Sequence, residues 1–550
     1  MFNFSFLKQK ISEITAHGEA PPGTRAEQAL STWLAEEFEN LGLSAEVQRF
    51  TCVSWLEKEV ELLVDAKHVQ AIAMPNSPSG YIEGELVHAG VGSRLNLSKV
   101  QGKIALTGMI PEDPDFIASQ YTMLVEAGAL GVVFYDFAAD VLRRIVINYW
   151  PSHLEGPNVP APIPAVTIKR ESALSFLDDR VHYAQLSVKT EYVKDAESSN
   201  VIVVNGEPSV LLTAHYDHWL SGAADDAVGV ALLLLLADEM AYQRDIGFMA
   251  FGAEEYGAPG YSAWYWSWGS RKYVEFAEKQ GELNDIVAVV NLDLPVRKPL
   301  IISASGPEYR DAVKELLGPG KVYELDSAYF DSFSFSRIGV PALTIHSMWN
   351  YIDYYHSDKD TIDHIEWDAV KLAKEYASKI VKSVANEKLG FFKYESLRIE
   401  LLELLKRASA FSEPPQQLFE ALNMLEPNEE LYRKLRRRLI KVVSGHVSKP
   451  KLLTSVLVPQ LLLIEDLEAV KRVLEGSATV EALATVERRW LAYEGHELPA
   501  LNMAPLMGFL ARIDSRARTA YLDEVLRSAR YWLDKIYIEL GSEIQAALFQ

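Results

Sequence analysis

Histidine and carboxylate side chains follow several apolar stretches of this chain at the point where each stretch ends. They are His215 and Asp217 after VLLTA, Asp225 and Asp226 in SGAADDAVG, Glu254 and Glu255 after FMAFGA, Asp293 after VAVVNL, and His356 in YYHSDKDT. Imidazole and carboxylate ligands without thiolate suit zinc, cobalt or manganese, whereas an all-oxygen set would favour calcium or magnesium. Two histidines and several carboxylates exceed what one tetrahedral ion uses, and they fit two ions about 3.5–4 Å apart. The pattern therefore predicts a two-metal site.

Each of these segments has a simpler interpretation when it is taken alone. A histidine at a strand end is more often a hydrogen-bonded loop residue than a ligand, and Asp225 and Asp226 could cap the helix that follows them. Asp217 lies two residues from His215, on the same side of an extended strand, and can accept the other ring N–H of that histidine. Together, however, so many polar groups at one sheet edge would be costly to leave unpaired, and a bound cation compensates for them.

From residue 200 onward, apolar strand patterns alternate with helical ones. The strands are NVIVV, VLLTAHYD, IGFMAFGAEE, VAVVNLDL, PLIISAS and PALTIHSM, and VGVALLLLLADEM is a buried helix. Such alternation predicts an α/β fold with a mixed, mostly parallel sheet flanked by helices. In open sheets of this kind, ligands bind beyond the carboxyl ends of the strands, where the candidate ligands lie.

The remaining stretches differ in pattern. Residues 24–41 have helical spacing and precede the strand SAEVQRF. Between about residues 53 and 188, short strands, loops with Pro and Gly and one helical segment indicate a β-rich module. From about residue 391 the pattern is helical only, as in SLRIELLELLKRAS, NEELYRKLRRRLIKVV and LIEDLEAVKRVLEG.

The composition excludes several classes of protein. The 550 residues are 49% hydrophobic, which excludes a disordered chain, and the net charge of −22 argues against binding to nucleic acid or to an anionic membrane. A single cysteine, Cys52, cannot form an internal disulfide framework. No signal peptide is visible, and the longest apolar run, residues 228–237, is about half of what a membrane span needs. We therefore expect a cytoplasmic protein.

In order and spacing, the motifs HYD, GAADDAVG, EEYG, NLD and YHSDKDT resemble those of the co-catalytic zinc exopeptidases of metallopeptidase clan MH. That group includes leucyl aminopeptidases, glutamate carboxypeptidase and the transferrin receptor. The segments QGKIALTG, LVEAGALGVVFYD and PAPIPAVTI resemble a protease-associated domain. The resemblance implies a catalytic domain of residues 1–52 and 195–390, a protease-associated insert of residues 53–194 and an all-α C-terminal domain of residues 391–550.

The resemblance also implies a role for each matching residue, around two Zn²⁺ ions per subunit, with Co²⁺ or Mn²⁺ as alternatives. His215 and Asp293 would hold one ion, Glu255 and His356 the other, and Asp225 would bridge both. The peptide bond between Asp225 and Asp226 would be cis. Glu254 would be the general base that takes a proton from the metal-bridging water. Tyr355 stands where some relatives place a donor to the developing oxyanion, although packing under the site explains it equally well.

Other residues near the motifs are harder to interpret. Ser332 stands where the family often has a histidine, so substrate contacts cannot be transferred to its loop. Arg297 and Arg337 could meet a substrate carboxylate, but ordinary salt bridges explain both. The aromatic residues of YSAWYWSWGS, residues 261–270, could line a subsite or simply pack a helix on the sheet. His218 and His346 are close enough to strand ends to line the cleft.

Several functions fit these motifs. The leading one is an aminopeptidase that releases N-terminal residues from peptides. A carboxypeptidase or dipeptidase is favoured by the domain layout, but it needs an arginine clamp that the sequence does not clearly show. A glutaminyl cyclase uses one zinc on a similar scaffold. A non-catalytic receptor or scaffold of transferrin-receptor type would tend to lose ligands or the base.

The two outer domains suggest further expectations. We expect the C-terminal helices to form a homodimer, as their position in the family suggests; the alternative is that they cap the catalytic domain. The protease-associated insert would cover the cleft and limit access to short peptides.

Overall fold

The structure is a computed structural model. It describes residues 3–548 apart from residues 93, 110–113, 150–159, 179, 205, 241, 260–264, 328, 425–427, 430–431, 433–445, 448–456, 459 and 479–512. Everything stated below concerns the described residues.

The part of the molecule that carries the predicted ligands, which we call the catalytic half after that prediction, is built on a mixed sheet. Its strand order is β14-β13-β15-β12-β10-β11-β9. The pairs β10–β11, β10–β12, β12–β15 and β13–β14 are parallel, whereas β9–β11 and β13–β15 are antiparallel. The strand bounds are β9 His182–Val204, β10 Val210–His215, β11 Ile246–Phe251, β12 Ala288–Leu292, β13 Ile301–Ala304, β14 Val322–Leu325 and β15 Ala342–His346. This arrangement confirms the predicted mostly parallel sheet.

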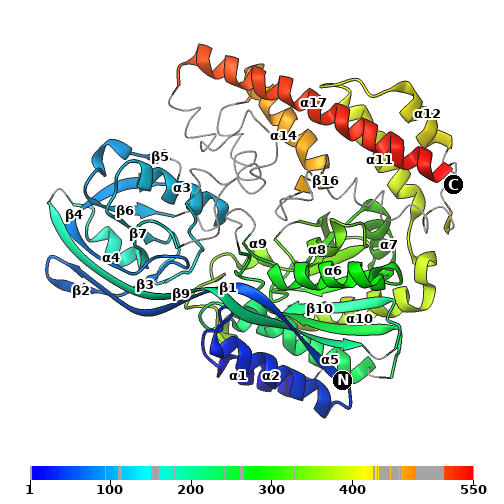
Figure 1. The fold of residues 1–550 in the computed structure, drawn as a ribbon, viewed down its shortest axis with the longest axis horizontal. Coiled ribbons are helices and arrows are strands. Elements are labelled where there is room, and N and C mark those ends of the chain that lie inside the picture. Colours follow the sequence, from blue (N-terminus) through cyan, green and yellow to red (C-terminus); the bar gives the residue numbers. More distant parts are fainter. Residues whose placement is uncertain are drawn as a thin grey trace.

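Helices cover both faces of this sheet (Figure 1). Because successive strand side chains point to opposite faces, Leu212 joins one core with helices α1, α2, α5, α7 and α10, and Leu211 joins the other with α6 and α8. The helix bounds are α1 Phe4–Thr15, α2 Arg25–Asn40, α5 Val228–Met240, α6 Trp268–Gln280, α7 Pro307–Leu317, α8 Ser332–Ser336, α9 Met348–Tyr351 and α10 Trp367–Glu387. Helix α5 has the predicted bounds, and Thr24 caps α2 by accepting from the Glu27 N–H.

Two long strands carry the sheet into the β-rich region, which we call the insert. Strand β1 (Ala45–Val64) pairs with β9 over most of its length, and beyond them the order continues through β4, β6, β7, β8 and β3. Further bounds are β2 Lys67–Val69, β3 Ala71–Ala73, β4 Gly80–Val91, β5 Arg94–Leu95, β6 Ile104–Gly108, α3 Pro114–Glu126, β7 Gly131–Tyr135, β8 Ala165–Ile168 and α4 Arg170–Leu174. The expected domain boundaries at 52/53 and 194/195 therefore fall inside two continuous strands, although the division itself stays a prediction.

The C-terminal region packs on the catalytic half through α11, which contacts α7 (Figure 1). Its described helices are α11 Tyr394–Ala408, α12 Gln416–Met424, α14 Gln460–Leu474 and α17 Ser515–Leu548. The purely helical expectation meets one exception, since the two-residue strands β16 (His446–Val447) and β17 (Leu457–Val458) pair with each other. Most of the predicted helix NEELYRKLRRRLIKVV lies outside the described residues. The expected roles of the C-terminal region, as a dimer interface or as a cap, stay predictions.

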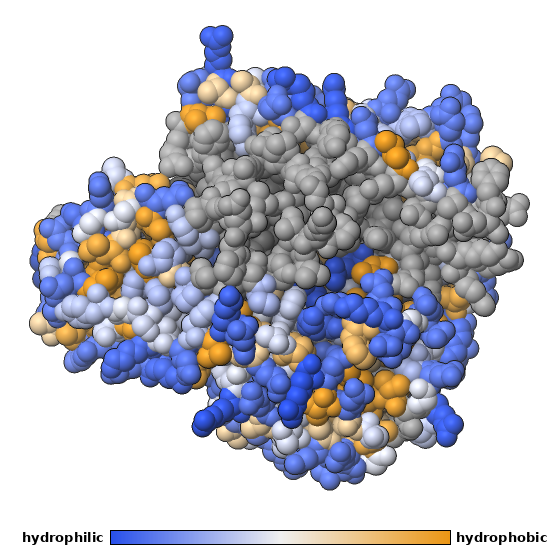
Figure 2. Space-filling view, viewed as in Figure 1, coloured by the Kyte–Doolittle hydropathy of each residue, from blue (hydrophilic) through white to orange (hydrophobic). Residues whose placement is uncertain are grey.

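The visible surface is mostly hydrophilic (Figure 2). Hydrophilic side chains cover much of the described face in Figure 2, and hydrophobic ones gather over part of the insert. Among the described helices, none combines the length and the apolar character needed to cross a membrane.

Candidate active site

The candidate ligands reach one edge of the sheet from five different segments. His215 is the last residue of β10, Asp293 directly follows β12, and Glu255 lies in the turn after β11. Asp225 lies between β10 and α5, in residues 223–227. His356 comes from the turn after α9 and is left-handed, with φ of 54°. All five side chains are buried, so the fold concentrates charge in a place with little access to water.

These side chains form two groups that share one carboxylate. His215, Asp225 and Asp293 make one group, and Asp225, Glu255 and His356 make the other, each with its ligand atoms within 4.8 Å of one another. The Nε2 atom of His215 lies 3.2 Å from Asp225 Oδ1, and the Nε2 atom of His356 lies 3.2 Å from Asp225 Oδ2. The two oxygens of Asp225 thus face the two histidines separately.

The electrostatics of the two groups suit divalent cations. Burial disfavours charge on every member, and the nearby imidazole rings of His215 and His356 nevertheless hold the pKa of Asp225 well below its usual range. Burial raises the pKa of Glu255 to about 7. Among the described ligand carboxylates and the adjacent Asp226, three buried oxygens accept no hydrogen bond: Asp225 Oδ2, Asp226 Oδ2 and Glu255 Oε1. Buried acceptors without donors are costly, and imidazole with carboxylate is a zinc-type ligand set, so the residues fit the metal that the sequence implies.

Asp217 and Asp226 act on the backbone around the ligands. The Asp217 carboxylate accepts hydrogen bonds from the N–H groups of Glu254 and Glu255, at 2.9 and 3.0 Å, and so fixes the turn that carries both. The ring Nδ1 of His215 instead lies 3.1 Å from the Asp217 carbonyl oxygen and 4.0 Å from its carboxylate. In place of the expected carboxylate–imidazole contact, the His215 ring therefore contacts the backbone of Asp217.

Asp226 holds the start of α5 against the residue that follows Asp293. Its Oδ1 atom accepts from the N–H groups of Gly229 and Leu294, at 3.1 and 2.9 Å. The peptide bond between Asp225 and Asp226 is cis, as the resemblance implies.

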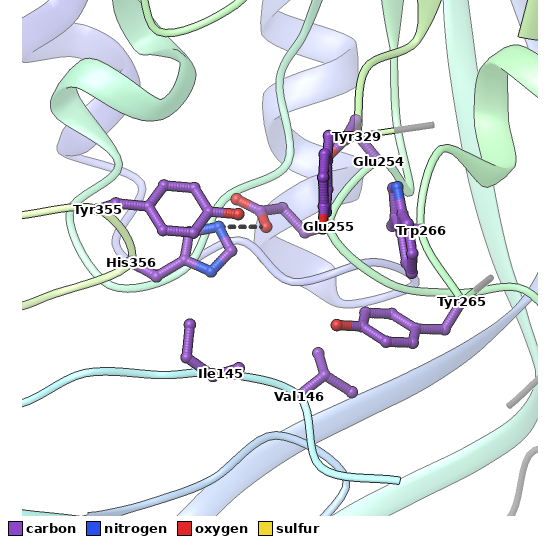
Figure 3. A pocket seen from close by; sticks show the side chains of 9 residues that line it. All are labelled: Ile145, Val146, Glu254, Glu255, Tyr265, Trp266, Tyr329, Tyr355 and His356. Atoms are coloured by element: carbon purple, nitrogen blue, oxygen red, sulfur yellow. Dashed lines mark ion pairs between the residues drawn. The ribbon is translucent and has the colours of Figure 1, made fainter. Parts of the chain in front are cut away.

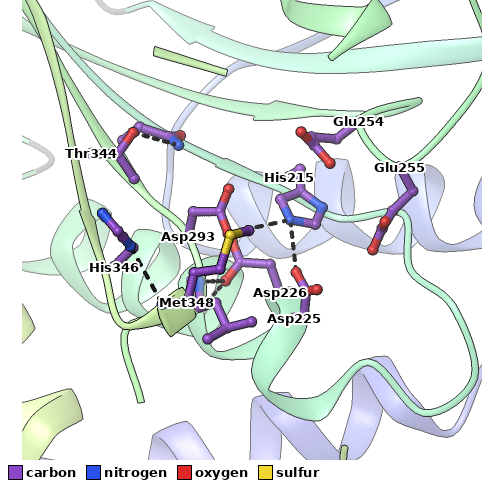
Figure 4. Close-up of polar contacts among 12 residues, drawn as sticks. His215, Asp225, Asp226, Glu254, Glu255, Asp293, Thr344, His346 and Met348 are labelled. Carbon is purple, nitrogen blue, oxygen red and sulfur yellow. Dashed lines mark hydrogen bonds and ion pairs between the residues drawn. The ribbon is translucent and has the colours of Figure 1, made fainter. Parts of the chain in front are cut away.

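Glu254 belongs to neither ligand group and lies near His215 and Glu255 in Figure 4. Its Oε1 atom accepts a hydrogen bond of 3.0 Å from the Ser267 hydroxyl, which orients the carboxylate. Burial raises the pKa of Glu254, and the charges of Asp331 and Asp293 raise it further, whereas His215 opposes them. A carboxylate with a raised pKa at the wall of a cleft can accept a proton near neutral pH.

A cleft of about 410 Å³ opens beside Glu254, Glu255 and His356 (Figure 3). Its other walls are aromatic or aliphatic: Ile145, Val146, Tyr265, Trp266, Tyr329 and Tyr355. Tyr265 and Trp266 belong to the predicted aromatic segment, whose residues 261–264 lie outside the described residues, and Trp268 begins α6. Tyr355 stacks on the His356 ring with centroids 3.7 Å apart, and its hydroxyl points toward Glu255 in Figure 3.

Four polar residues singled out by the sequence lie away from this cleft. The Ser332 hydroxyl donates to Asp326, at 2.6 Å, inside the protein. Arg297 stacks on the rings of Tyr351 and Tyr354. Two histidines are buried with internal partners: His218 lies 3.0 Å from the Gly18 carbonyl and His346 lies 2.8 Å from the Ser303 hydroxyl.

Burial lowers the pKa of two of the residues singled out by the sequence, His346 and Arg337. It lowers the pKa of His346 to about 3, so that imidazole is neutral. Arg337 caps the end of α8, and burial lowers its pKa to about 10, with Glu278 and Glu275 opposing the effect. None of the described residues that line the cleft is an arginine or a lysine.

The sequence reasoning missed several contributors to the site. Asp360 accepts from the N–H groups of Ala224 and Asp225, at 2.8 and 3.2 Å, and so orients the shared ligand. Asp331 is fully buried, and its charge acts on both His215 and Glu254. Asp360 had a detectable signal, because it lies four residues after His356 in the same motif. Ile145 and Val146 had no such signal, because they lie in the insert, far in sequence from every ligand motif.

The comparisons with known proteins assign this part of the chain to a class. Residues 200–381, which hold all the candidate ligands, match peptidase family M28 and form a domain of that family. Among solved structures, the zinc aminopeptidase BSAP from Bacillus subtilis is similar, with 22% identity, a TM-score of 0.55 and coverage of 69% of this chain and 94% of that one. A peptidase M28 precursor from Shewanella amazonensis has 19% identity, a TM-score of 0.58 and coverage of 70% and 94%. These likenesses establish a shared fold. No match was found among curated protein sequences.

Proposed function

We propose that this protein is a metal-dependent aminopeptidase that uses two zinc ions, with cobalt or manganese as alternatives. The observation that carries the proposal is the pair of ligand groups that share Asp225, next to Glu254 and an open cleft, in a peptidase M28 domain. His215 and Asp293 would hold one ion, Glu255 and His356 the other, and Asp225 both.

In this proposal the protein residues divide the work of peptide hydrolysis. When bound, the metal pair polarises the scissile carbonyl and acidifies water. Glu254 Oε2 takes a proton from the attacking water and delivers it to the leaving amine, while Ser267 keeps Oε1 in place. The Tyr355 hydroxyl is the candidate donor to the oxygen that gains charge during the attack. The aromatic walls of the cleft exclude water from the reacting groups.

The charge of the cleft supports action at the amino end of a peptide. Recognition of a free C-terminal carboxylate generally uses arginine or lysine, and the described cleft lining holds neither. Carboxylates, by contrast, attract an ammonium group, and Glu254 and Glu255 reach the cleft wall. A carboxypeptidase or dipeptidase remains the alternative that the following test separates.

A peptide panel decides the direction of cleavage. The same apolar tripeptide is supplied with both ends free, with an N-acetyl group and with a C-terminal amide, and the products are identified by mass spectrometry. We expect the free and amidated peptides to lose their first residue and the acetylated peptide to resist. Cleavage that survives acetylation and stops on amidation would show a carboxypeptidase. Metal analysis of the same preparation should find about two ions per chain, whereas one ion would favour a cyclase-type site.

A further inference from the structure

One segment of the insert reaches across to the turn that carries His356. Residues 141–144 run beside residues 356–358, where Arg143 bridges to Ser357. The Leu142 N–H donates to Asp358 Oδ1 at 2.9 Å, and the Asp358 N–H donates back to the Leu142 carbonyl at 2.9 Å. The next residues of the same segment, Ile145 and Val146, line the cleft (Figure 3). The insert therefore meets the catalytic half at the candidate metal centre.

Arg143 contributes the largest number of hydrogen bonds to this turn. Its guanidinium is fully buried and donates through Nη1 to the carbonyls of Ile352 and Tyr355, and through Nη2 to the carbonyl of Asp353. Its Nε donates to Asp136, which follows β7 in the insert and lies 2.5 Å away. Three carbonyls of one turn are thus gathered by a single planar group, which is the geometry that arginine offers and lysine does not.

The turn has internal hydrogen bonds, such as those from the N–H and the hydroxyl of Ser357 to the Tyr354 carbonyl, but it also depends on the insert at His356. His356 has a left-handed backbone, a conformation that costs a non-glycine residue energy and persists where the surroundings enforce it. The His356 carbonyl accepts from the Arg144 N–H at 2.8 Å, and the preceding carbonyl, of Tyr355, accepts from Arg143. The carbonyl of the ligand residue and the carbonyl of the residue before it therefore both accept hydrogen bonds from the insert.

We propose that Arg143, anchored by Asp136, is a positioning residue for His356, through which the insert completes one of the two metal positions. The inference rests on the metal pair of the proposed function. It assigns Arg143 to the Glu255–His356 position and not to the His215–Asp293 position, whose ligands rest on strands β10 and β12. Residues that hold metal ligands in place typically contribute 10- to 100-fold to metal affinity.

The test measures Zn²⁺ binding to the metal-free full chain by competition with a chromophoric chelator. Wild type is compared with Arg143→Lys, which keeps the charge, and Arg143→Met, which removes it. Asp136→Asn is a milder change that leaves Arg143 in place. His182→Gln is the matched control, because His182 is a buried residue of the insert that pairs with Asp65 and Asp178, away from the metal centre.

We expect one Zn²⁺ to bind as in wild type and the other to bind roughly 10- to 100-fold more weakly in both Arg143 variants. Asp136→Asn should shift the same ion less, and His182→Gln should lower the melting temperature while leaving both affinities unchanged. In a His356→Ala background, Arg143→Met should have no further effect on the remaining ion. In a His215→Ala background, it should still weaken binding.

Each contrary result has a distinct meaning. Wild type that binds fewer than two Zn²⁺ ions overturns the metal pair without any variant. Wild type with two ions and Arg143 variants with unchanged affinities overturn the role of Arg143 and leave the metal pair standing. Equal weakening of both positions, or the same weakening in His182→Gln, overturns the positioning role in favour of general destabilisation.

Discussion

Two clusters of buried polar side chains lie on the same sheet, and they differ in how their polar atoms are satisfied. One lies at the carboxyl edge and is called the metal-centre cluster after its proposed role; it consists of His215, Asp225, Asp226, Glu254, Glu255, Asp293 and His356. The other, which we call the serine network, lies inside and consists of Thr213, Asn291, Thr344, Ser332, Ser336 and Asp326. In the serine network each hydroxyl and amide finds a partner, such as Ser332 and Ser336, which both donate to Asp326 at 2.6 Å. The metal-centre cluster leaves three carboxylate oxygens without a donor in the described part of the chain.

The difference separates a structural cluster from a binding site. Hydrogen bonds between neutral hydroxyls and one carboxylate can satisfy a buried network without any ligand. A cluster with more carboxylates than donors is stable only if protons or cations compensate for it. We therefore expect changes in the metal-centre cluster to alter metal binding or turnover, and changes in the serine network to alter stability alone.

Glu254→Gln should produce the largest effect. The amide keeps an acceptor for Ser267 but cannot take a proton, so kcat should fall by roughly 10³-fold. Bound zinc should stay at the wild-type level, because Glu254 belongs to neither ligand group. Steady-state kinetics and metal analysis on one preparation measure both quantities.

The neighbouring substitution Glu255→Gln provides the contrast. Glu255 contributes to the Asp225–His356 group, so this variant should lose affinity for one ion. A Glu254→Gln enzyme with near-normal turnover, or one that loses metal as Glu255→Gln does, would contradict the assignment of the base.

Asp360→Asn should have an intermediate effect, on metal affinity. The amide nitrogen of asparagine cannot accept a hydrogen bond, so one of the two backbone N–H groups that Asp360 now satisfies loses its acceptor and the support of Asp225 weakens. Because Asp225 belongs to both ligand groups, we expect both ions to bind roughly tenfold more weakly in a chelator competition. The control is Asp363→Asn, because Asp363 is exposed and lies three residues from Asp360. This variant should bind both ions as wild type does. Weakening of a single ion would argue against a shared carboxylate.

The sequence made the strand-borne half of the site predictable. His215 and Asp293 follow apolar strands directly, and the carboxyl ends of parallel strands meet at one edge. Their convergence therefore needs only the strand pattern. Pattern reasoning also predicted α5 with its observed bounds, because its continuous apolar run lies between a polar turn and a charged end, which mark where the helix begins and ends.

The rest of the site depends on contacts between segments far apart in the chain. Arg143 and Tyr355 are more than 200 residues apart, and no local pattern in residues 141–149 indicates that their side chains meet the His356 turn. The sequence also could not predict where the Ser332 hydroxyl points. A serine can donate inward to Asp326, as it does here, or outward to a substrate. Long-range packing decides such cases, and periodicity carries no information about it.

Asp326→Asn should have the smallest effect and should appear only in stability. Burial raises the pKa of Asp326 to about 7, although Ser332 and Ser336 oppose the shift. A carboxyl group whose pKa is higher in the folded protein than the ordinary value of 3.8 stabilises the fold below that value, and the contribution is lost as the pH rises through 7. The asparagine does not ionise, and the two hydroxyls can rotate to serve its oxygen and its amide. The free energy of unfolding of the variant, relative to wild type, should therefore rise between pH 5 and pH 8 by on the order of 1–3 kcal/mol. Urea midpoints at the two pH values measure the change, with exposed Asp368→Asn as the control. Kinetics and metal content should be unaffected, and a loss of zinc in Asp326→Asn would break the distinction between the two clusters.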